Sequence, residues 1–157
     1  MKLYIEQRAF SWGDMFSIYD ENGNPVYYVK GEVFTLGKRL HLYDLNGNEL
    51  AYIEQKVFSF FPKYLIFVGG QQIGEVVQVF HFFKPRYAVN GLGWEIMGDL
   101  FAHEYEITNG ITTIAAVSKE WFSFTDAYEI RFGFDVDEVA ALSVCLVIDA
   151  FIDRNGG

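Results

Sequence analysis

A hairpin unit recurs along nearly the whole chain, and this repetition restricts the possible folds more than any other feature of the sequence. Each unit begins with Phe, then usually Ser or Thr, then an aromatic residue or leucine, and an alternating strand follows a few residues later. The clear copies begin at Phe10-Ser11-Trp12, Phe34-Thr35-Leu36, Phe58-Ser59-Phe60, Phe80-His81-Phe82 and Phe122-Ser123-Phe124. A sixth, degenerate copy occupies residues 100–107. The repeat predicts a protein built from similar β-hairpins.

Turn signals follow five of these units. They are Asn22-Gly23, Asn46-Gly47, Gly69-Gly70, Asn90-Gly91 and Asn109-Gly110. Asn-Gly and Gly-Gly pairs supply the positive φ angles that tight hairpin turns require. The turns recur at intervals of roughly 20 residues, which is the length of two strands and two turns. Six units predict about twelve antiparallel strands between residues 2 and 132.

A meander of this length has to hide the edges of its sheet, and closure into a barrel does so completely. We therefore predict an all-β, closed antiparallel barrel with one helix. A barrel of about twelve strands is too wide for its own side chains to fill. Residues 138–152 are apolar on nearly all sides, as buried helices are, and Asp135 and Asp137 precede them, where carboxylates cap a helix N-terminus. We predict a single domain over residues 1–157, with this helix in the centre of the barrel.

The composition and charge exclude several classes of protein. Hydrophobic residues make up 51% of the chain, which excludes wholesale disorder. The net charge of −9 argues against a nucleic-acid-binding protein, because such proteins carry a basic surface. Cys145 is the only cysteine, so no internal disulfide can form. No signal peptide or transmembrane segment is recognisable, and we expect a cytoplasmic protein, peripheral at the membrane if it binds lipid.

Alternate turns of an up-and-down barrel lie at opposite ends, so the hairpin pattern sorts the loops into two groups. The end with the Asn-Gly turns carries acidic residues such as Asp20 and Asp44. The opposite end gathers basic residues, which suit a phosphate or another anionic group because Arg and Lys contact phosphate oxygens well. The candidate ligand-binding residues are Lys38, Arg39, Lys63, Lys84 and Arg86. The ordinary preference of charged residues for loops explains the same pattern without a ligand, and Asp14 and Asp126 at this end dilute the positive charge.

The remaining polar motifs outside the helix favour structural roles. The segment 20–24 is similar to a calcium loop, but Pro25 takes the position of the required glycine, and a hairpin turn explains it. His41, His81 and His103 lack the spacing of metal ligands. We expect no catalytic residue, no metal and no cofactor.

Within the predicted helix, two residues need an explanation. Cys145 lies among apolar neighbours, where a thiol is inert. Asp149 is costly to bury without a partner, and the chain direction places it near the basic end, from which we expect a structural partner. Core packing accounts for most aromatic residues of the repeated segments. Any that are exposed beside the basic residues would form an interfacial anchor.

Several segments, taken in order, carry a resemblance to a known family. They are Asp20-Glu21-Asn22-Gly23-Asn24, Tyr43-Asp44-Leu45-Asn46-Gly47-Asn48, Ala51-Tyr52-Ile53-Glu54-Gln55-Lys56, Phe82-Phe83-Lys84-Pro85-Arg86-Tyr87 and Leu146-Val147-Ile148-Asp149-Ala150. Over essentially its whole length the chain resembles the LURP-one-related family, bacterial members included, of the tubby C-terminal-like superfamily. Its tail is also similar to that of phospholipid scramblases. The resemblance implies a twelve-stranded barrel around a hydrophobic C-terminal helix.

Relatives in that superfamily bind phosphoinositides or are linked to lipid movement, so the resemblance supports a lipid ligand. The phosphoinositide-contacting residues of tubby have no assigned counterparts in this sequence. We expect a non-enzymatic binding module whose basic end engages an anionic ligand such as a phospholipid head group. The alternative is a protein-interaction or scaffold domain that uses an exposed aromatic strand face or the acidic end. An enzymatic or scramblase-like activity is less favoured, because the one long apolar segment is assigned to the barrel core.

Overall fold

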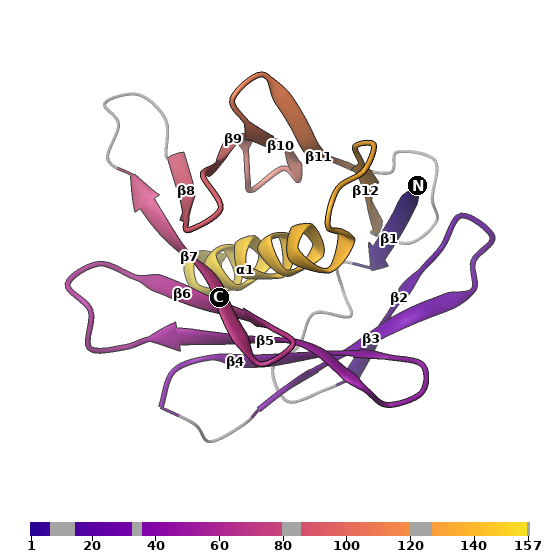
Figure 1. Ribbon diagram of the computed structural model, residues 1–157, viewed down its shortest axis with the longest axis horizontal. Helices are drawn as coiled ribbons and strands as arrows, with labels where there is room; N and C mark the ends of the chain where they lie inside the picture. The colour runs from indigo at the N-terminus through magenta and orange to yellow at the C-terminus, as the bar shows by residue number, and fades with distance from the viewer. Residues whose placement is uncertain (7–14, 33–35, 80–85, 120–126, 157) are drawn as a thin grey trace.

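The computed structural model describes residues 1–6, 15–32, 36–79, 86–119 and 127–156 (Figure 1). The strands are β1 (Lys2–Glu6), β2 (Met15–Tyr19), β3 (Pro25–Gly31), β4 (Arg39–Asp44), β5 (Glu49–Lys56), β6 (Lys63–Val68), β7 (Gln71–Val79), β8 (Arg86–Asn90), β9 (Trp94–Asp99), β10 (Glu104–Asn109), β11 (Thr112–Lys119) and β12 (Ala127–Phe132). The single helix among the described residues is α1 (Glu138–Gly156), which continues past residue 152, the end expected from the sequence.

All of these strands form one closed antiparallel barrel, which confirms the predicted fold. Strands that are consecutive in the sequence are neighbours in the barrel, and β12 pairs with β1 to close it. The closing pair runs from Lys2 opposite Arg131 to Glu6 opposite Ala127. Figure 1 shows the strands arranged around α1. The sheet therefore has no free edge strand in the described part of the chain, which is how a long meander avoids edge-to-edge association.

Along most of the strands, side chains alternate between an apolar interior and a more polar outer surface. In β4, Leu40 and Leu42 are buried, whereas His41 and Tyr43, on the outer face, are not. This period of two follows directly from the alternating sequence pattern of sheets with one wet face.

Tight turns built around aspartates join several strands at one end. Oδ1 of Asp20 accepts hydrogen bonds from the backbone N–H groups of Asn22 and Asn24. Gly23 has a φ angle of 79°, a left-handed backbone conformation that glycine adopts more easily than residues with a Cβ atom. The turn after β4 repeats this arrangement around Asp44. The segment 20–24 is therefore a hairpin turn, as predicted.

The helix α1 lies inside the barrel, and all its side chains from residue 140 to residue 151 are buried. Oδ1 of Asp137 accepts a hydrogen bond of 3.0 Å from the backbone N–H of Ala140, which is the geometry of an N-cap. Asp135 lies in the preceding turn with a φ angle of 55°. Within the described ranges, no helix is both long enough and apolar enough to cross a membrane.

The strand order places the connections alternately at two ends of the barrel. The acidic rim comprises the turns 20–24, 45–48, 69–70, 91–93, 110–111 and 133–137. The basic rim comprises the connections that follow β1, β3, β5, β7, β9 and β11, parts of which lie outside the described residues. Because β12 ends at the acidic rim, α1 begins there and runs toward the basic rim.

Candidate functional site

A groove of about 640 Å³ opens at the basic rim between the β3–β4 and β5–β6 connections. Two hydrogen bonds hold the first connection against β5. The backbone N–H of Lys38 donates to Oε1 of Gln55 (3.0 Å), and the backbone N–H of Gln55 donates to the carbonyl oxygen of Lys38 (2.9 Å). Gly37 permits this close approach, because a Cβ atom there would lie 2.8 Å from Cγ1 of Val57 and its φ angle is 87°. One wall of the groove is thereby fixed in place.

Among the described residues, three basic side chains line this groove: Arg39 from β4, Lys56 from the end of β5 and Lys63 from the start of β6. Lys56 stands directly opposite Lys63 in the β5–β6 register, and like charges at such positions destabilise a sheet. Lys63 Nζ lies 3.4 Å from Oε2 of Glu75, and Glu54 lines the groove opposite Arg39. In the described lining of the groove, the cations outnumber the carboxylates. An anion between the two lysines would offset their repulsion.

Arg39 also carries a hydrogen-bond donor without a partner. Its Nε atom is buried and has no acceptor among the described residues. A guanidinium group has five N–H donors, and leaving one buried and unsatisfied costs free energy.

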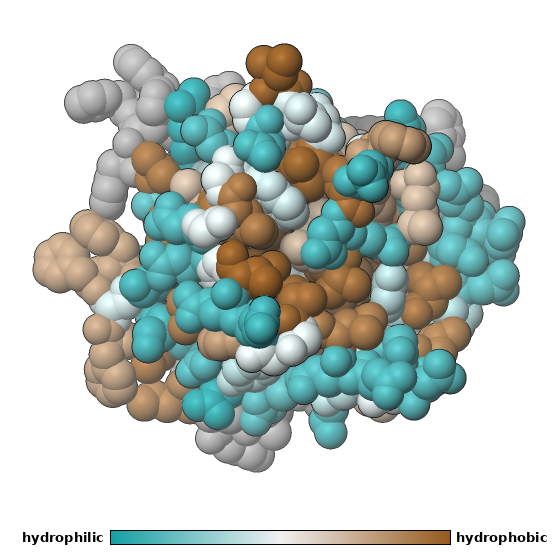
Figure 2. Space-filling view, viewed as in Figure 1, coloured by the Kyte–Doolittle hydropathy of each residue, from teal (hydrophilic) through white to brown (hydrophobic). Residues whose placement is uncertain are grey.

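The β5–β6 connection forms the other wall, and its rings project into solvent. Phe58 and Phe60 are 92% and 94% exposed, and the rings of Phe60 and Phe61 pack edge to face with centroids 4.9 Å apart. Figure 2 shows hydrophobic side chains projecting at the left edge, where Figure 1 shows this connection. Phe58 and Phe60 are thus exceptions to the core packing expected of the repeated segments. Trp12 and the Trp121–Phe122 pair lie outside the described residues.

The predicted ligand-binding residues do not all meet in this groove. Arg39 and Lys63 share it. Nζ of Lys38 instead donates a hydrogen bond of 3.0 Å to the carbonyl oxygen of Ala150, so this lysine holds the C-terminal part of α1. Lys84 lies outside the described residues.

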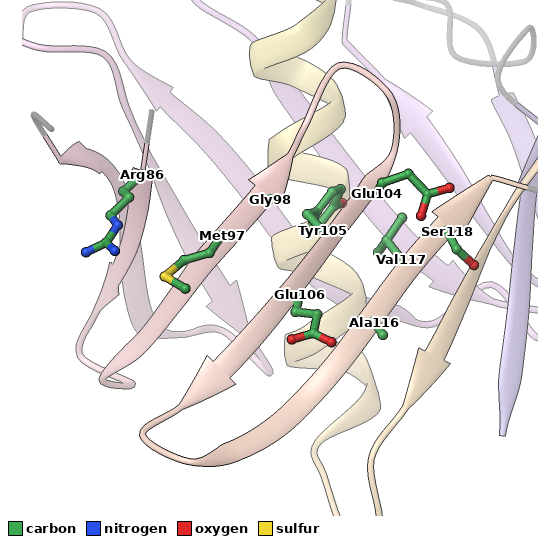
Figure 3. A pocket seen from close by; sticks show the side chains of 9 residues that line it. All are labelled: Arg86, Met97, Gly98, Glu104, Tyr105, Glu106, Ala116, Val117 and Ser118. Carbon is green, nitrogen blue, oxygen red and sulfur yellow. The ribbon is translucent and has the colours of Figure 1, made fainter. Parts of the chain in front are cut away.

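Arg86 belongs to a second hollow, of about 630 Å³, over strands β8–β11. Figure 3 shows Arg86 on β8, Met97 on β9, and the carboxylates of Glu104 and Glu106 extending from β10. Oε1 of Glu104 also accepts a hydrogen bond of 3.0 Å from the backbone N–H of Lys119. The described lining of this hollow has two carboxylates and one arginine, which makes it less suited to an anion than the groove.

A buried polar cluster joins α1 to the barrel wall near the basic rim. Asp149 accepts a hydrogen bond from the hydroxyl of Tyr128, and its other oxygen lies 3.3 Å from Nε2 of His103. The rings of His103 and Tyr128 stack with centroids 4.4 Å apart. Burial, assisted by the charge of Asp149, raises the pKa of Tyr128 well above 10, which keeps its hydroxyl a donor. The partners of Asp149 come from the expected end of the barrel, and their geometry indicates a structural role.

The thiol of Cys145 is enclosed in the barrel. Cys145 is fully buried, and burial raises its pKa to about 12. At neutral pH the thiol is therefore protonated and out of contact with solvent, which makes it a poor nucleophile. This agrees with the inert role predicted for it.

On the outer surface, His41 lies between two carboxyl groups. Its Nε2 atom is 2.8 Å from Oε2 of Glu32, and its Nδ1 atom contacts Glu49. Burial lowers the pKa of His41, but the hydrogen bonds and charges of Glu49 and Glu32 together raise it above 6.5. The carboxyl groups bind different ring nitrogens, and no group of three potential metal ligands occurs in the part of the chain that the structure describes. His81 lies outside that part.

A row of aromatic rings crosses the outer face of β3–β6. The centroids of Tyr28 and Tyr43 are 5.0 Å apart, those of His41 and Tyr52 are 5.0 Å apart, and those of Tyr52 and Phe67 are 5.8 Å apart. The side chains are half-buried against one another. This row is an aromatic strand face of the kind that the alternative function requires.

Lys56 is a site residue that was not predicted from the sequence. The repeated hairpin could have indicated Lys56, because the residues that flank a hairpin loop lie on neighbouring, paired strands. Once the loop length is known, Lys56 falls opposite Lys63. The exposure of Phe58 and Phe60 had no comparable signal, because the same residue pattern also suits a packed core.

Comparison with known proteins adds independent information. The profile of the LURP-one-related family matches residues 1–149. The uncharacterized protein YxjI of Bacillus subtilis (strain 168) is 36% identical over 149 residues, which cover 95% of this chain and 92% of that protein. Among solved structures, an X-ray structure of a protein from Arabidopsis thaliana matches with a TM-score of 0.65 and 16% identity, covering 99% of this chain and 92% of that chain. This structural match shows that the fold is shared.

Proposed function

This chain belongs to the LURP-one-related family, and we propose that it is a non-enzymatic module that binds an anionic, phosphate-bearing group in the groove at the basic rim. One observation carries the proposal: Arg39, Lys56 and Lys63 surround a single open groove, and their charges are incompletely neutralised there. Arg and Lys together suit phosphate oxygens, Arg through paired N–H donors and Lys as a compact charge. A phospholipid head group has this chemistry. We further propose that the protein is cytoplasmic and, through this binding, associates peripherally with membranes.

The chemistry of the groove supports binding rather than catalysis. Ser59 carries the only hydroxyl among the described residues that line it, and this hydroxyl donates to the carbonyl oxygen of Phe61. No histidine lines the groove among the described residues to act as a base beside it. Cys145, the single cysteine, is enclosed inside the barrel.

The proposal is tested by reversing the charge of the two facing lysines. The double variant Lys56→Glu/Lys63→Glu should bind vesicles of phosphatidylcholine and phosphatidylglycerol at least tenfold more weakly than the wild type, since each basic residue near an anionic surface contributes about 1 kcal/mol. Binding by the wild type should weaken as salt is added. Inorganic pyrophosphate should raise the melting temperature of the wild type and not that of the variant.

The chain offers a matched control at the acidic rim. Lys2 and Arg131 also face each other, on β1 and β12, so Lys2→Glu/Arg131→Glu changes the net charge by the same amount. This control should retain pyrophosphate stabilisation and most vesicle binding. Equal losses in the two double variants would show that net charge alone governs binding. In that case the groove would not be the site.

A protein-interaction role is the second candidate, favoured by the row of rings on β3–β6. If that row is the functional surface, Tyr52→Ser should abolish cross-linking to a protein partner in cells and leave vesicle binding unchanged. Loss of both activities would argue against two separate surfaces.

A further inference from the structure

The tip of the β5–β6 connection is a compact aromatic projection. Phe58 and Phe60 are almost completely exposed, although phenylalanine is mostly a core residue. The hydroxyl of Ser59 binds the carbonyl oxygen of Phe61, and Phe61 supports the ring of Phe60 by edge-to-face packing. The projection is therefore a locally stabilised structure, and the fold leaves its two rings in water where burial against a partner would be favourable.

Other connections at the same end present apolar side chains to solvent. Besides Phe58 and Phe60, the exposed large hydrophobic residues at this end include, among the described residues, Met15, Leu36, Val57, Phe61, Val79 and Phe101. They lie in or directly beside several different connections at one end of the barrel. A ring of loop tips of this kind can make simultaneous contact with a broad flat surface, whereas a globular partner would touch a part of the ring.

The charges next to the exposed apolar side chains distinguish the two ends. The acidic rim also has exposed apolar residues, among them Ile111 and Phe134. Its turns carry the carboxylates of Asp20, Glu21, Asp135 and Asp137, and Asp44 lies at the end of β4 next to the turn 45–48. The projecting rings of the basic rim instead stand beside Arg39, Lys56 and Lys63. An anionic surface would attract the basic rim, repel the acidic one and so orient the whole molecule.

From this combination we infer that the basic rim docks on the surface of an anionic lipid bilayer, with Phe58 and Phe60 inserted among the head groups and upper acyl chains. The inference rests on the proposed function and extends it, because it assigns the phosphate to a lipid in a bilayer and not to a soluble molecule. Aromatic rings next to lysines are typical of interfacial binding: the rings enter the apolar boundary and the cations stay at the level of the phosphates.

The first test replaces the two rings with a small polar residue. Phe58→Ser/Phe60→Ser should weaken binding to vesicles of phosphatidylcholine and phosphatidylglycerol by roughly tenfold or more, because each ring would lose part of its burial. Stabilisation by inorganic pyrophosphate should be unchanged, since the cations remain. Ile111→Ser/Phe134→Ser at the acidic rim is the matched control, because it also removes two almost fully exposed apolar side chains. It should bind vesicles like the wild type, and equal weakening in both variants would overturn the inference.

The second test measures insertion directly. Ser59→Cys labelled with an environment-sensitive fluorophore should show a blue shift and a gain in intensity when these vesicles are added, and brominated lipids should quench it. Cys145 does not interfere, because it is buried and its pKa is about 12. A label at Asn46→Cys, in an acidic-rim turn, should report no change. A protein that sediments with vesicles while the label at residue 59 stays in water would disprove insertion.

The outcomes separate this inference from the proposed function. If pyrophosphate stabilises the protein but no vesicle binds, the ligand is a soluble phosphate, and the docking inference fails while the proposed function stands. If neither probe binds, the proposed function fails as well. If the wild type self-associates without lipid and Phe58→Ser/Phe60→Ser is monomeric, the rings form an interface between copies of the chain and the docking inference is wrong.

Discussion

Replacing Tyr128 with Phe should destabilise the protein by about 2 kcal/mol, because it removes a hydrogen-bond donor from a site that water cannot reach. The hydroxyl of Tyr128 donates to Oδ2 of Asp149 inside the barrel, and the side chains of both residues are buried. The phenylalanine ring can keep the stacking on His103, so the core loses little packing. An unsatisfied buried acceptor costs about 1 to 3 kcal/mol. His103 remains as a partner for Asp149, which should keep the cost below the roughly 3 to 5 kcal/mol of breaking a buried charged pair outright.

Urea unfolding followed by circular dichroism measures this loss, with Tyr4→Phe as the matched control. The hydroxyl of Tyr4 donates to Oε2 of Glu129 at 3.3 Å, in a partly exposed position, so the same substitution there should cost less than about 1 kcal/mol. In an Asp149→Leu background, Tyr128→Phe should become nearly neutral, because the acceptor is gone. Similar losses at Tyr128 and Tyr4, or an undiminished loss in the Asp149→Leu background, would refute the buried hydrogen bond as the cause.

Three further outcomes are expected. The pKa of His41 is raised in the folded protein, so protonated His41 stabilises the fold fully at pH values below 6.5, and this contribution is lost as the pH rises through the folded pKa. The urea midpoints of His41→Gln and wild type should therefore differ more at low pH than at high pH. The opposite trend would contradict the ion pairs with Glu32 and Glu49. Asp137→Ala should lower the free energy of unfolding by about 1 kcal/mol through loss of the N-cap, and an unchanged urea midpoint would count against the cap. Cys145 should resist a thiol-reactive disulfide reagent in the native protein and react fully in denaturant; rapid reaction in the native state would show that the barrel opens.

The barrel could be predicted from the sequence because its determinants are local. Asn22-Gly23 and the other turn pairs specify where the chain reverses, since positive φ angles are a property of the residues themselves. The alternation in β4 and β12 specifies which side chains face the core. The closure of the barrel follows from the free-energy cost of exposed strand edges. The start of α1 is also set locally, because Asp137 caps a helix that begins at the next residue.

The composition of the groove depends on where distant segments meet. Lys38 and Arg39 are neighbours in the sequence and look equally suited to bind an anion. In the structure, Lys38 binds the carbonyl oxygen of Ala150 in α1, 112 residues away, and only Arg39 lines the groove. Neither outcome can be read from the residues on either side. The helix has to lie in the barrel before its carbonyl oxygens come within reach of the basic rim.

The sequence by itself thus determined the hairpins, the identity of the core-facing positions and the general charge difference between the two rims. Only the tertiary structure decided that Lys56 faces Lys63, that Asp149 meets His103 and Tyr128, and that Phe58 and Phe60 stay outside the core. The physical reason is the range of the interactions involved. Turn geometry and side-chain alternation act between neighbouring residues, whereas strand register, helix position and the space left in a filled barrel are set by the packing of the whole chain at once.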